Sequence, residues 1–130
     1  MIGNLNHIAI VVPDLKKAVE IYNVALGAKV SDPVDIPDHG VRVIFVELDN
    51  TKIELLLQIG KNSPIASYLE RNPSGGIHHI CYSVEDILNA KDRCIAQGLT
   101  VIGSGEPQIG AHVKPVLFLH PKDLCGTLVE

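Results

Sequence analysis

The first half of the chain alternates between β-rich runs and one amphipathic segment. Residues 6–12 form an apolar, β-rich run that ends at Pro13, and Asp14 stands where a helix N-cap belongs. Apolar residues then recur at helical spacing up to Gly27, namely Leu15, Ala18, Val19, Tyr22 and Leu26. Next come a short strand near 28–31, a loop marked by Pro33, Pro37 and Gly40, and strands at 41–48 and 52–59 that flank Asp49-Asn50. The pattern therefore predicts the order β-α-β-β-β.

The second half repeats this order. Ser63-Pro64 predicts a short linker helix, because proline suits the first helical position. A strand at 77–83 leads to Ser83 and Asp86, whose spacing resembles a capping box. A helical face follows as far as Gly98 and is made of Ile87, Ala90, Cys94 and Ile95. We expect the remaining strands near 99–103, 114–120 and 126–130.

Individual residues repeat along with the elements. His7, Asp14 and Ala18 recur 72 positions later as His79, Asp86 and Ala90, and the strand ending at Glu54 corresponds to the one ending at Glu130. Such a repeat predicts pseudo-twofold symmetry. Each half is too small to bury much surface alone, so we expect one α+β domain, 1–130. Two βαβββ modules (about 1–60 and about 77–130), joined by a linker helix (about 63–72), would form one curved, mainly antiparallel sheet around a metal site.

The composition argues against several kinds of partner. The net charge is −4 and there is no basic stripe, which argues against nucleic acid. No apolar run reaches the roughly 18 residues that a membrane helix needs. The three cysteines (Cys81, Cys94 and Cys125) lack CxxC spacing and indicate reduced thiols. The N-terminal residues carry no secretory signal, so we expect a cytoplasmic location, or the mitochondrial matrix if a transit peptide has been removed.

The repeat also selects four residues for chemistry. His7 and His79 occupy equivalent points on the first strand of each module, and Glu54 and Glu130 do so on the fourth. In a twofold arrangement these side chains converge, and two imidazoles with two carboxylates suit a six-coordinate divalent ion that keeps two positions for water or substrate. Taken singly, each residue is more often a strand histidine or a solvated glutamate without a ligand. Four at matched positions favour a metal site.

His78 stands beside His79 on the same predicted strand. Strand side chains alternate between faces, so only one of the two can point toward the site. The repeat aligns His79 with His7. We therefore expect His79 to be the ligand and His78 to face the other way.

Several motifs together resemble the methylmalonyl-CoA epimerases of the vicinal oxygen chelate superfamily. The motifs are KIELL (52–56), SPIA (63–66), GGIHHICYSV (75–84), IGAHVKPVLFLHPKD (109–123) and LVE (128–130), so the resemblance covers essentially the whole chain. It implies the paired-module fold and a divalent ion held by His7, Glu54, His79 and Glu130. Co²⁺ is favoured by the resemblance over Mn²⁺, Ni²⁺, Zn²⁺ or Fe²⁺. The resemblance also implies an acyl-CoA substrate, a homodimer, and interconversion of (2R)- and (2S)-methylmalonyl-CoA.

Epimerisation needs groups that move a proton. The α-hydrogen of such a substrate lies between a thioester carbonyl and a carboxylate, so a base must remove it and an acid must return one to the opposite face. The resemblance makes Glu130 the leading candidate for one role. Some bacterial relatives carry a second glutamate where this chain has Val43. Glu47, on the same strand face as Val43 by alternation, is a candidate replacement. A water relay, or rotation of the substrate over a single base, also stays open.

Other residues have candidate roles in substrate binding. Lys114, His120 and Lys122 could meet the acyl carboxylate or the CoA phosphates, although a solvated strand end is the ordinary alternative for such residues. We expect His39 and His112 in loops.

Two other functions remain open from the sequence. One is a different metal-dependent enzyme on the same scaffold, such as a glyoxalase or a ring-cleaving dioxygenase, and the other is a non-catalytic ligand-binding module. A fourth ligand, Glu130, argues against the dioxygenase, which favours a three-ligand face. The intact ligand set argues against a non-catalytic module.

Overall fold

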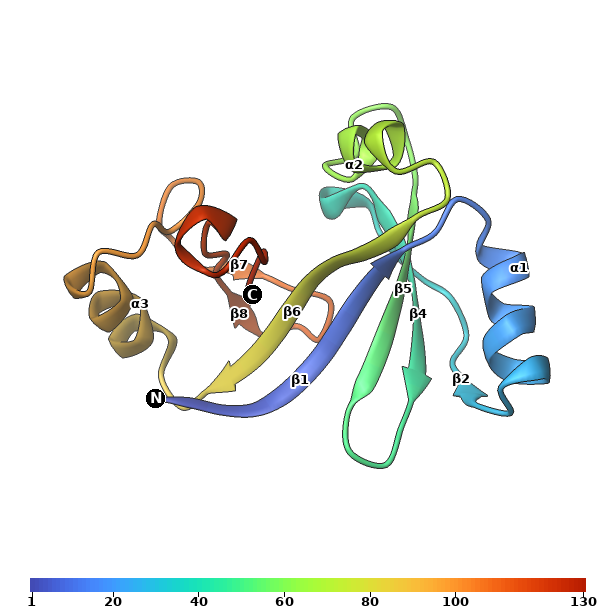
Figure 1. The fold of residues 1–130 in the computed structure, drawn as a ribbon, viewed down its shortest axis with the longest axis horizontal. Coiled ribbons are helices and arrows are strands. Elements are labelled where there is room, and N and C mark those ends of the chain that lie inside the picture. Colours follow the sequence, from blue (N-terminus) through green and yellow to red (C-terminus); the bar gives the residue numbers. More distant parts are fainter. The chain divides into compact units, whose positions relative to one another are not determined.

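The computed structural model describes all residues, 1–130, and they form two compact units (Figure 1). The N-terminal unit comprises His7–His78, and the C-terminal unit comprises Met1–Asn6 together with His79–Glu130. Strands β1 (Ile2–Val11) and β6 (Gly76–Val84) each contribute residues to both units. The elements confirm the expected α+β class. No helix has the length and apolar character needed to span a bilayer.

The sheet of the N-terminal unit has the strand order β2-β4-β5-β1, with β3 paired to β4. Its other strands are β2 (Lys29–Val30), β3 (Val34–Ile36), β4 (Val41–Glu47) and β5 (Lys52–Gln58). Strand β1 is parallel to β5, whereas β2, β3 and β5 are antiparallel to β4.

Strand β3 lies within the segment marked by Pro33, Pro37 and Gly40, which we predicted to be a loop, and it corrects that prediction. Its backbone pairs with β4, and the register places Asp35 opposite Arg42. The Arg42 guanidinium donates to both carboxylate oxygens of Asp35, and these hydrogen bonds hold the pKa of Asp35 below its ordinary value. A tertiary partner therefore forms a strand between two prolines that local sequence assigns to a loop.

Side-chain alternation gives this sheet two different apolar faces. One face carries the cluster Ala9, Val11, Val41, Val43 and Leu56, which packs on Ile65 and on Tyr68 and Leu69 of α2 (Ala66–Arg71). The other face carries Ile44, Val46 and Leu55, and α1 (Leu15–Glu20) covers it with Leu15 and Ala18 (Figure 1). His7 and Glu54 share the parity of Ala9 and Leu56, so they lie on the face that α2 covers.

Helices α1 and α3 both begin after an aspartate, at equivalent points of the repeat. Asp14 accepts a hydrogen bond from the backbone N–H of Lys17 at 3.0 Å, and Asp86 accepts two from the N–H groups of Leu88 and Asn89 at 2.9 and 3.0 Å. Asp86 is thus itself the N-cap of α3 (Ile87–Ala96), which corrects the expected capping box. The helix predicted up to Leu26 continues past α1 as a π-helical turn, Ile21–Ala25.

The C-terminal unit has shorter strands than the sequence predicts. Besides β6 it contains a separate hairpin of β7 (Gln108–Ile109) and β8 (Pro115–Val116). The strands predicted at 99–103, 114–120 and 126–130 are reduced largely to bridges at Val101, Leu119 and Val129. Two features of the backbone account for this difference. Gly103 and Gly105, and then Cys125 and Gly126, adopt positive φ angles that break the extended conformation.

One parallel register occurs in both units. In the N-terminal unit Ile8 pairs with Ile53, and in the C-terminal unit Ile80 forms a parallel bridge with Val129. The N–H groups of Ile80 and Tyr82 donate to the carbonyls of Leu128 and Glu130 at 3.1 and 3.0 Å, which extends the second pairing. Ile8 and Ile80 are 72 residues apart. The sequence repeat is therefore also a repeat of local structure.

We expect Leu55→Ala to lower the free energy of unfolding by about 2–5 kcal/mol, because it leaves a cavity under α1. Leu55 is 0% exposed, whereas Leu88, the matched control, is 52% exposed on α3. Leu88→Ala removes the same atoms from an exposed position and should lower the free energy of unfolding much less. Urea unfolding of both variants measures the difference, and equal losses would contradict the importance of this cluster for stability.

Candidate metal centre

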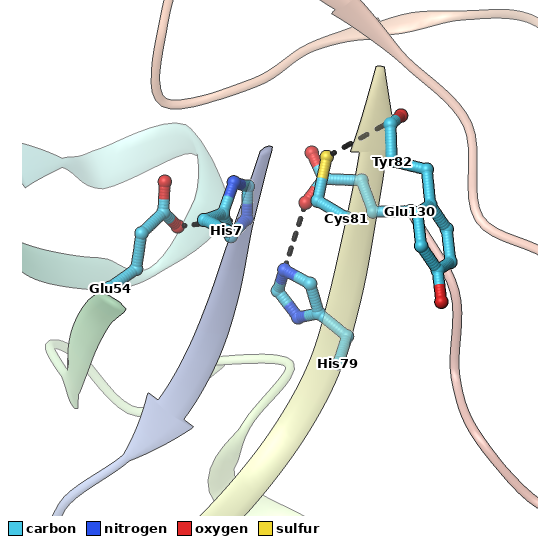
Figure 2. A network of polar contacts seen from close by, with 6 residues as sticks. All are labelled: His7, Glu54, His79, Cys81, Tyr82 and Glu130. Carbon is cyan, nitrogen blue, oxygen red and sulfur yellow. Dashed lines mark hydrogen bonds and ion pairs between the residues drawn. The ribbon is translucent and has the colours of Figure 1, made fainter. Parts of the chain in front are cut away.

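His7 and Glu54 form a buried pair in the N-terminal unit. His7 Nε2 lies 3.4 Å from Glu54 Oε2, and the two side chains are only 3% and 4% exposed (Figure 2). The register explains the contact, because His7 lies opposite Lys52 on β5 and Glu54 follows two residues later on the same face.

His79 and Glu130 form the corresponding pair in the C-terminal unit. His79 Nε2 lies 2.8 Å from Glu130 Oε2, with side chains that are 7% and 8% exposed (Figure 2). The bridge from Ile80 to Val129 sets His79 beside Leu128, just as His7 lies beside Lys52. The structure thus joins the four predicted ligands into two buried histidine–carboxylate pairs, one in each unit.

A phenylalanine lies opposite each carboxylate, a feature that the sequence analysis missed. Phe45 on β4 is the cross-strand partner of Glu54. The bridge from Leu119 to Val129 places Phe118 opposite Glu130, and the Phe118 ring meets the His79 ring edge to face at 5.3 Å. The signal was present in the sequence as VIFVE (43–47) and VLFLH (116–120), which include the only two phenylalanines of the chain.

Cys81 lies beside the second pair. The bridge from Ile80 to Val129 makes Cys81 the parallel partner of Glu130, just as Ala9 is the parallel partner of Glu54. The Cys81 Sγ lies within 4.8 Å of a Glu130 carboxylate oxygen. The sequence suggested only a reduced thiol here. The parallel partner of the carboxylate therefore differs between the units, an alanine methyl group in one and a thiol in the other.

The donor chemistry of each pair fits a divalent ion. An ionised carboxylate that is removed from water is costly unless a cation or good hydrogen bonds compensate it. Imidazole nitrogen and carboxylate oxygen are both common ligands of divalent first-row metals. Each pair supplies one of each in nearly dry surroundings. The binding of a single ion by all four side chains stays a prediction.

His78 has different surroundings from His79. The His78 ring contacts the Tyr68 ring edge to face, with 5.4 Å between centroids. It is partly exposed, whereas His79 is buried. His78 and His79 are adjacent on β6, so their side chains leave the strand on opposite faces.

Glu47 lies at the exposed end of β4. It is the cross-strand partner of Lys29 on one side and of Lys52 on the other, and Lys52 is in turn opposite His7. Glu47 therefore lies on the same face of the sheet as His7, in the same line of cross-strand partners. The two residues are separated by two strand spacings, or about 10 Å. Val43, in contrast, is only 1% exposed and belongs to the apolar cluster of that face.

Two of the candidate substrate-binding residues, His120 and Lys122, lie at the 3-10 turn Pro121–Asp123. The Nδ1 of His120 accepts a hydrogen bond from the N–H of Lys122 at 3.1 Å, which leaves the proton of a neutral ring on Nε2. Hydrogen bonds from the side chain and the backbone N–H of Thr100 hold the pKa of Asp123 below its ordinary value and anchor the same turn. Lys114 is exposed at the end of the β7–β8 turn.

The two remaining histidines lie in turns, as predicted. His39 ends a 3-10 turn (Pro37–His39), and His112 lies in the turn between β7 and β8. His112 is half-buried.

Residues 6–118 match the family model described as the glyoxalase/bleomycin resistance protein/dioxygenase superfamily. The chain is 66% identical over 130 residues to the ethylmalonyl-CoA/methylmalonyl-CoA epimerase of Cereibacter sphaeroides, a match that covers 100% of this chain and 97% of the relative. It is 54% identical over 129 residues to the human mitochondrial methylmalonyl-CoA epimerase, which covers 99% of this chain and 73% of the relative.

A solved structure of methylmalonyl-CoA epimerase in complex with methylmalonyl-CoA and NH4+ superposes on this chain with a TM-score of 0.90. The sequence identity is 27%, and the match covers 99% of this chain and 92% of the other. The similarity in fold thus extends over nearly the full length of both proteins.

We expect His79→Ala to remove most of the bound divalent metal, because it deletes one imidazole ligand. His78→Ala, the control on the adjacent residue of β6, should retain it. Metal content after dialysis against limiting Co²⁺ measures both. Loss of metal in His78→Ala with retention in His79→Ala would place the ligand one residue earlier and contradict the repeat alignment.

Proposed function

Because the chain belongs to the methylmalonyl-CoA epimerase family of the vicinal oxygen chelate (glyoxalase-like) superfamily, we propose that it is an isomerase that interconverts (2R)- and (2S)-methylmalonyl-CoA. Full-length identity of 66% to an ethylmalonyl-CoA/methylmalonyl-CoA epimerase carries the assignment. Two buried histidine–carboxylate pairs in repeated positions support it from this chain's own residues. The family model spans glyoxalases and dioxygenases as well, but the relatives at 66% and 54% identity are both named epimerases, which favours this assignment over those alternatives.

Family membership and the donor set indicate a divalent metal ion. The further proposal is that His7, Glu54, His79 and Glu130 hold one ion together, and that this ion is Co²⁺. When bound, such an ion supplies Lewis-acid stabilisation of the negative charge that develops on the substrate's thioester oxygen. Two nitrogen and two oxygen ligands leave positions for two substrate oxygens in an octahedral site.

Glu130 is the proposed group for proton transfer, and Glu54 is proposed as a ligand only. Glu130 Oε2 lies 2.8 Å from His79 Nε2, and the carboxylate of this residue is the group that would take or return the α-proton. A positioned carboxylate that moves a proton in the transition state typically contributes 10²–10⁴-fold to the rate. The second proton-transfer group is proposed to be Glu47, which shares the sheet face of His7 and Glu54.

The acyl-CoA substrate offers anionic groups that suit the basic residues of the C-terminal unit. Lys114 and Lys122 are exposed, and His120 presents an Nε2–H donor because its Nδ1 is already an acceptor. We assign these three residues to the substrate carboxylate or the CoA phosphates. The Cereibacter relative also bears ethylmalonyl-CoA in its name, so ethylmalonyl-CoA is a second proposed substrate. The arrangement as one domain, the homodimer and the cytoplasmic location stay predictions.

Replacing Glu54 and Glu130 by glutamine should separate metal binding from proton transfer. Glutamine keeps a ligating oxygen and a similar volume but cannot ionise. Glu54→Gln should therefore retain metal and a measurable fraction of turnover. Glu130→Gln should retain metal but lose about 10²–10⁴-fold in turnover. Metal content and the rate of α-proton exchange of methylmalonyl-CoA in D₂O are the measurements.

Wild-type turnover in metal-loaded Glu130→Gln would exclude Glu130 as the base. Wild-type protein that binds metal yet exchanges no α-proton would contradict the epimerase assignment itself.

Glu47→Gln tests whether two different groups act on the two faces of the α-carbon. If Glu47 serves one face, epimerisation should fall by about 10²-fold. One epimer should still exchange its α-proton with D₂O, because Glu130 still reaches that face. Deuterium incorporation into each pure epimer measures this, with exposed Glu70→Gln as the control. A wild-type rate of epimerisation in Glu47→Gln would exclude Glu47 as the second proton-transfer group. A water relay, or rotation of the substrate over a single base, would then remain as the mechanism.

A further inference from the structure

Val113, in the turn between β7 and β8 (Figure 1), has a backbone conformation that valine rarely adopts. Its φ angle is 58°, and the only other non-glycine residue with a positive φ angle is Cys125. For a β-branched residue this region is a genuine outlier, because the side chain crowds the backbone. The conformation therefore costs folding free energy that glycine at the same position would not lose.

The side chain of Val113 does little for the stability of the fold. It is 82% exposed, more than any other large hydrophobic residue of the chain. Two backbone hydrogen bonds close the turn, from the N–H of Val113 to the carbonyl of Gly110 at 3.0 Å and from the N–H of Gly110 to the carbonyl of Lys114 at 2.9 Å. A single exposed valine is common on protein surfaces. A residue held at a strained backbone angle is less common, and such residues cluster at active sites and ligand-binding segments.

The turn that carries Val113 borders the proposed proton-transfer carboxylate. A methyl group at position 110 would lie 3.4 Å from Glu130 Oε1, so the backbone of Gly110 is next to that side chain. Val113 is hydrogen-bonded to Gly110 and is followed by Lys114, which is exposed. One short turn therefore combines a border with the buried carboxylate, an exposed apolar side chain and an exposed cation.

An acyl-CoA carries groups that suit these three features in the same order. The reacting α-carbon comes first, the pantetheine arm with its methylene and methyl groups follows, and the phosphates come last. The Glu130 side chain is only 8% exposed, so an acyl group that reaches it leaves the long CoA arm at the surface of the unit. An apolar side chain beside a cation is the surface that such an arm would bind.

We propose that Val113 is a binding residue for the pantetheine arm of the acyl-CoA, an inference that rests on the proposed function. The valine gives the arm an apolar surface to pack on, and Lys114 beside it meets the phosphates. Contact with the arm removes an 82% exposed side chain from water, which favours binding.

Coenzyme A itself gives a test that needs no turnover. Val113→Gly and Val113→Asn both tolerate the backbone angle but lack the apolar side chain. The Kd for coenzyme A, measured by calorimetry, should rise about fivefold in both, because burial of roughly half of a valine side chain is lost. Cys125→Gly, the matched control, relieves the same backbone angle at another exposed residue and should leave the Kd unchanged. A Kd within about twofold of wild type in both Val113 variants would overturn the proposal, as would a wild-type protein that binds no coenzyme A.

Turnover of two thioesters tests whether the contact is with the arm. With methylmalonyl-CoA, Val113→Gly should raise KM about fivefold and leave kcat within about twofold, because the reacting groups are unchanged. With the methylmalonyl thioester of ethanethiol, which lacks the arm, kcat/KM should be the same for wild type and variant. An equal loss with both thioesters would place the contact on the acyl group and overturn the proposal. Wild-type protein that binds coenzyme A but exchanges no α-proton would instead contradict the proposed function.

Two further measurements test whether Val113 serves a ligand rather than the fold or a second copy of the chain. The urea midpoint of Val113→Asn should not fall, since asparagine tolerates the positive φ angle and no packed side chain is lost. Sedimentation at equal concentration should give the same oligomeric state for wild type and variant. A clearly lower midpoint, or the loss of an oligomer that wild type forms, would overturn the proposal.

Discussion

Two short stretches of parallel pairing, β1 with β5 and β6 with residues 128–130, decide where both histidine–carboxylate pairs lie. In each, side chains alternate, so the residue next to the carboxylate points to the opposite face. Leu55 and Val129, the neighbours of Glu54 and Glu130, are both buried. A slip of one residue would exchange the buried apolar side chain for the carboxylate on every strand involved. The hydrophobic core thus enforces the register on which the polar site depends.

The repeat supplies this arrangement twice, and several residues around it differ between the two copies. Both keep an aspartate N-cap, a histidine on the first strand and a phenylalanine opposite the carboxylate. The neighbours differ, with Ala9 replaced by Cys81 and Glu47 by His120. The shared residues are those that hold the donors in place. Two of the differing residues, Ala9 and Cys81, are the register partners of the carboxylates. A single reaction on a substrate without twofold symmetry needs such unlike surroundings.

The sequence could predict the parts that local patterns determine. The helices, their aspartate caps and the strands of the N-terminal unit follow from periodicity and from Asp14 and Asp86. The repeat also selected His7, Glu54, His79 and Glu130, which the structure joins pairwise. Strand β3 and the β7–β8 hairpin could not be predicted, because their pairing depends on tertiary partners rather than on local propensity. For the same reason the position of Cys81 beside Glu130 is visible only once the register is known.

The surroundings of the two carboxylates also bear on why one, rather than both, would transfer protons. Glu54 lies in the middle of β5, between β1 and β4, with fully buried Ala9 as its parallel partner. Strand neighbours on both sides limit its movement, which suits a fixed ligand. Glu130 follows Val129, which forms isolated bridges to Ile80 and Leu119 rather than belonging to a continuous strand. The Glu130 side chain is also slightly more exposed than that of Glu54, 8% against 4%. A carboxylate that must exchange a proton with a substrate needs the more accessible of the two positions, which favours Glu130 for that role and Glu54 for the role of a fixed ligand.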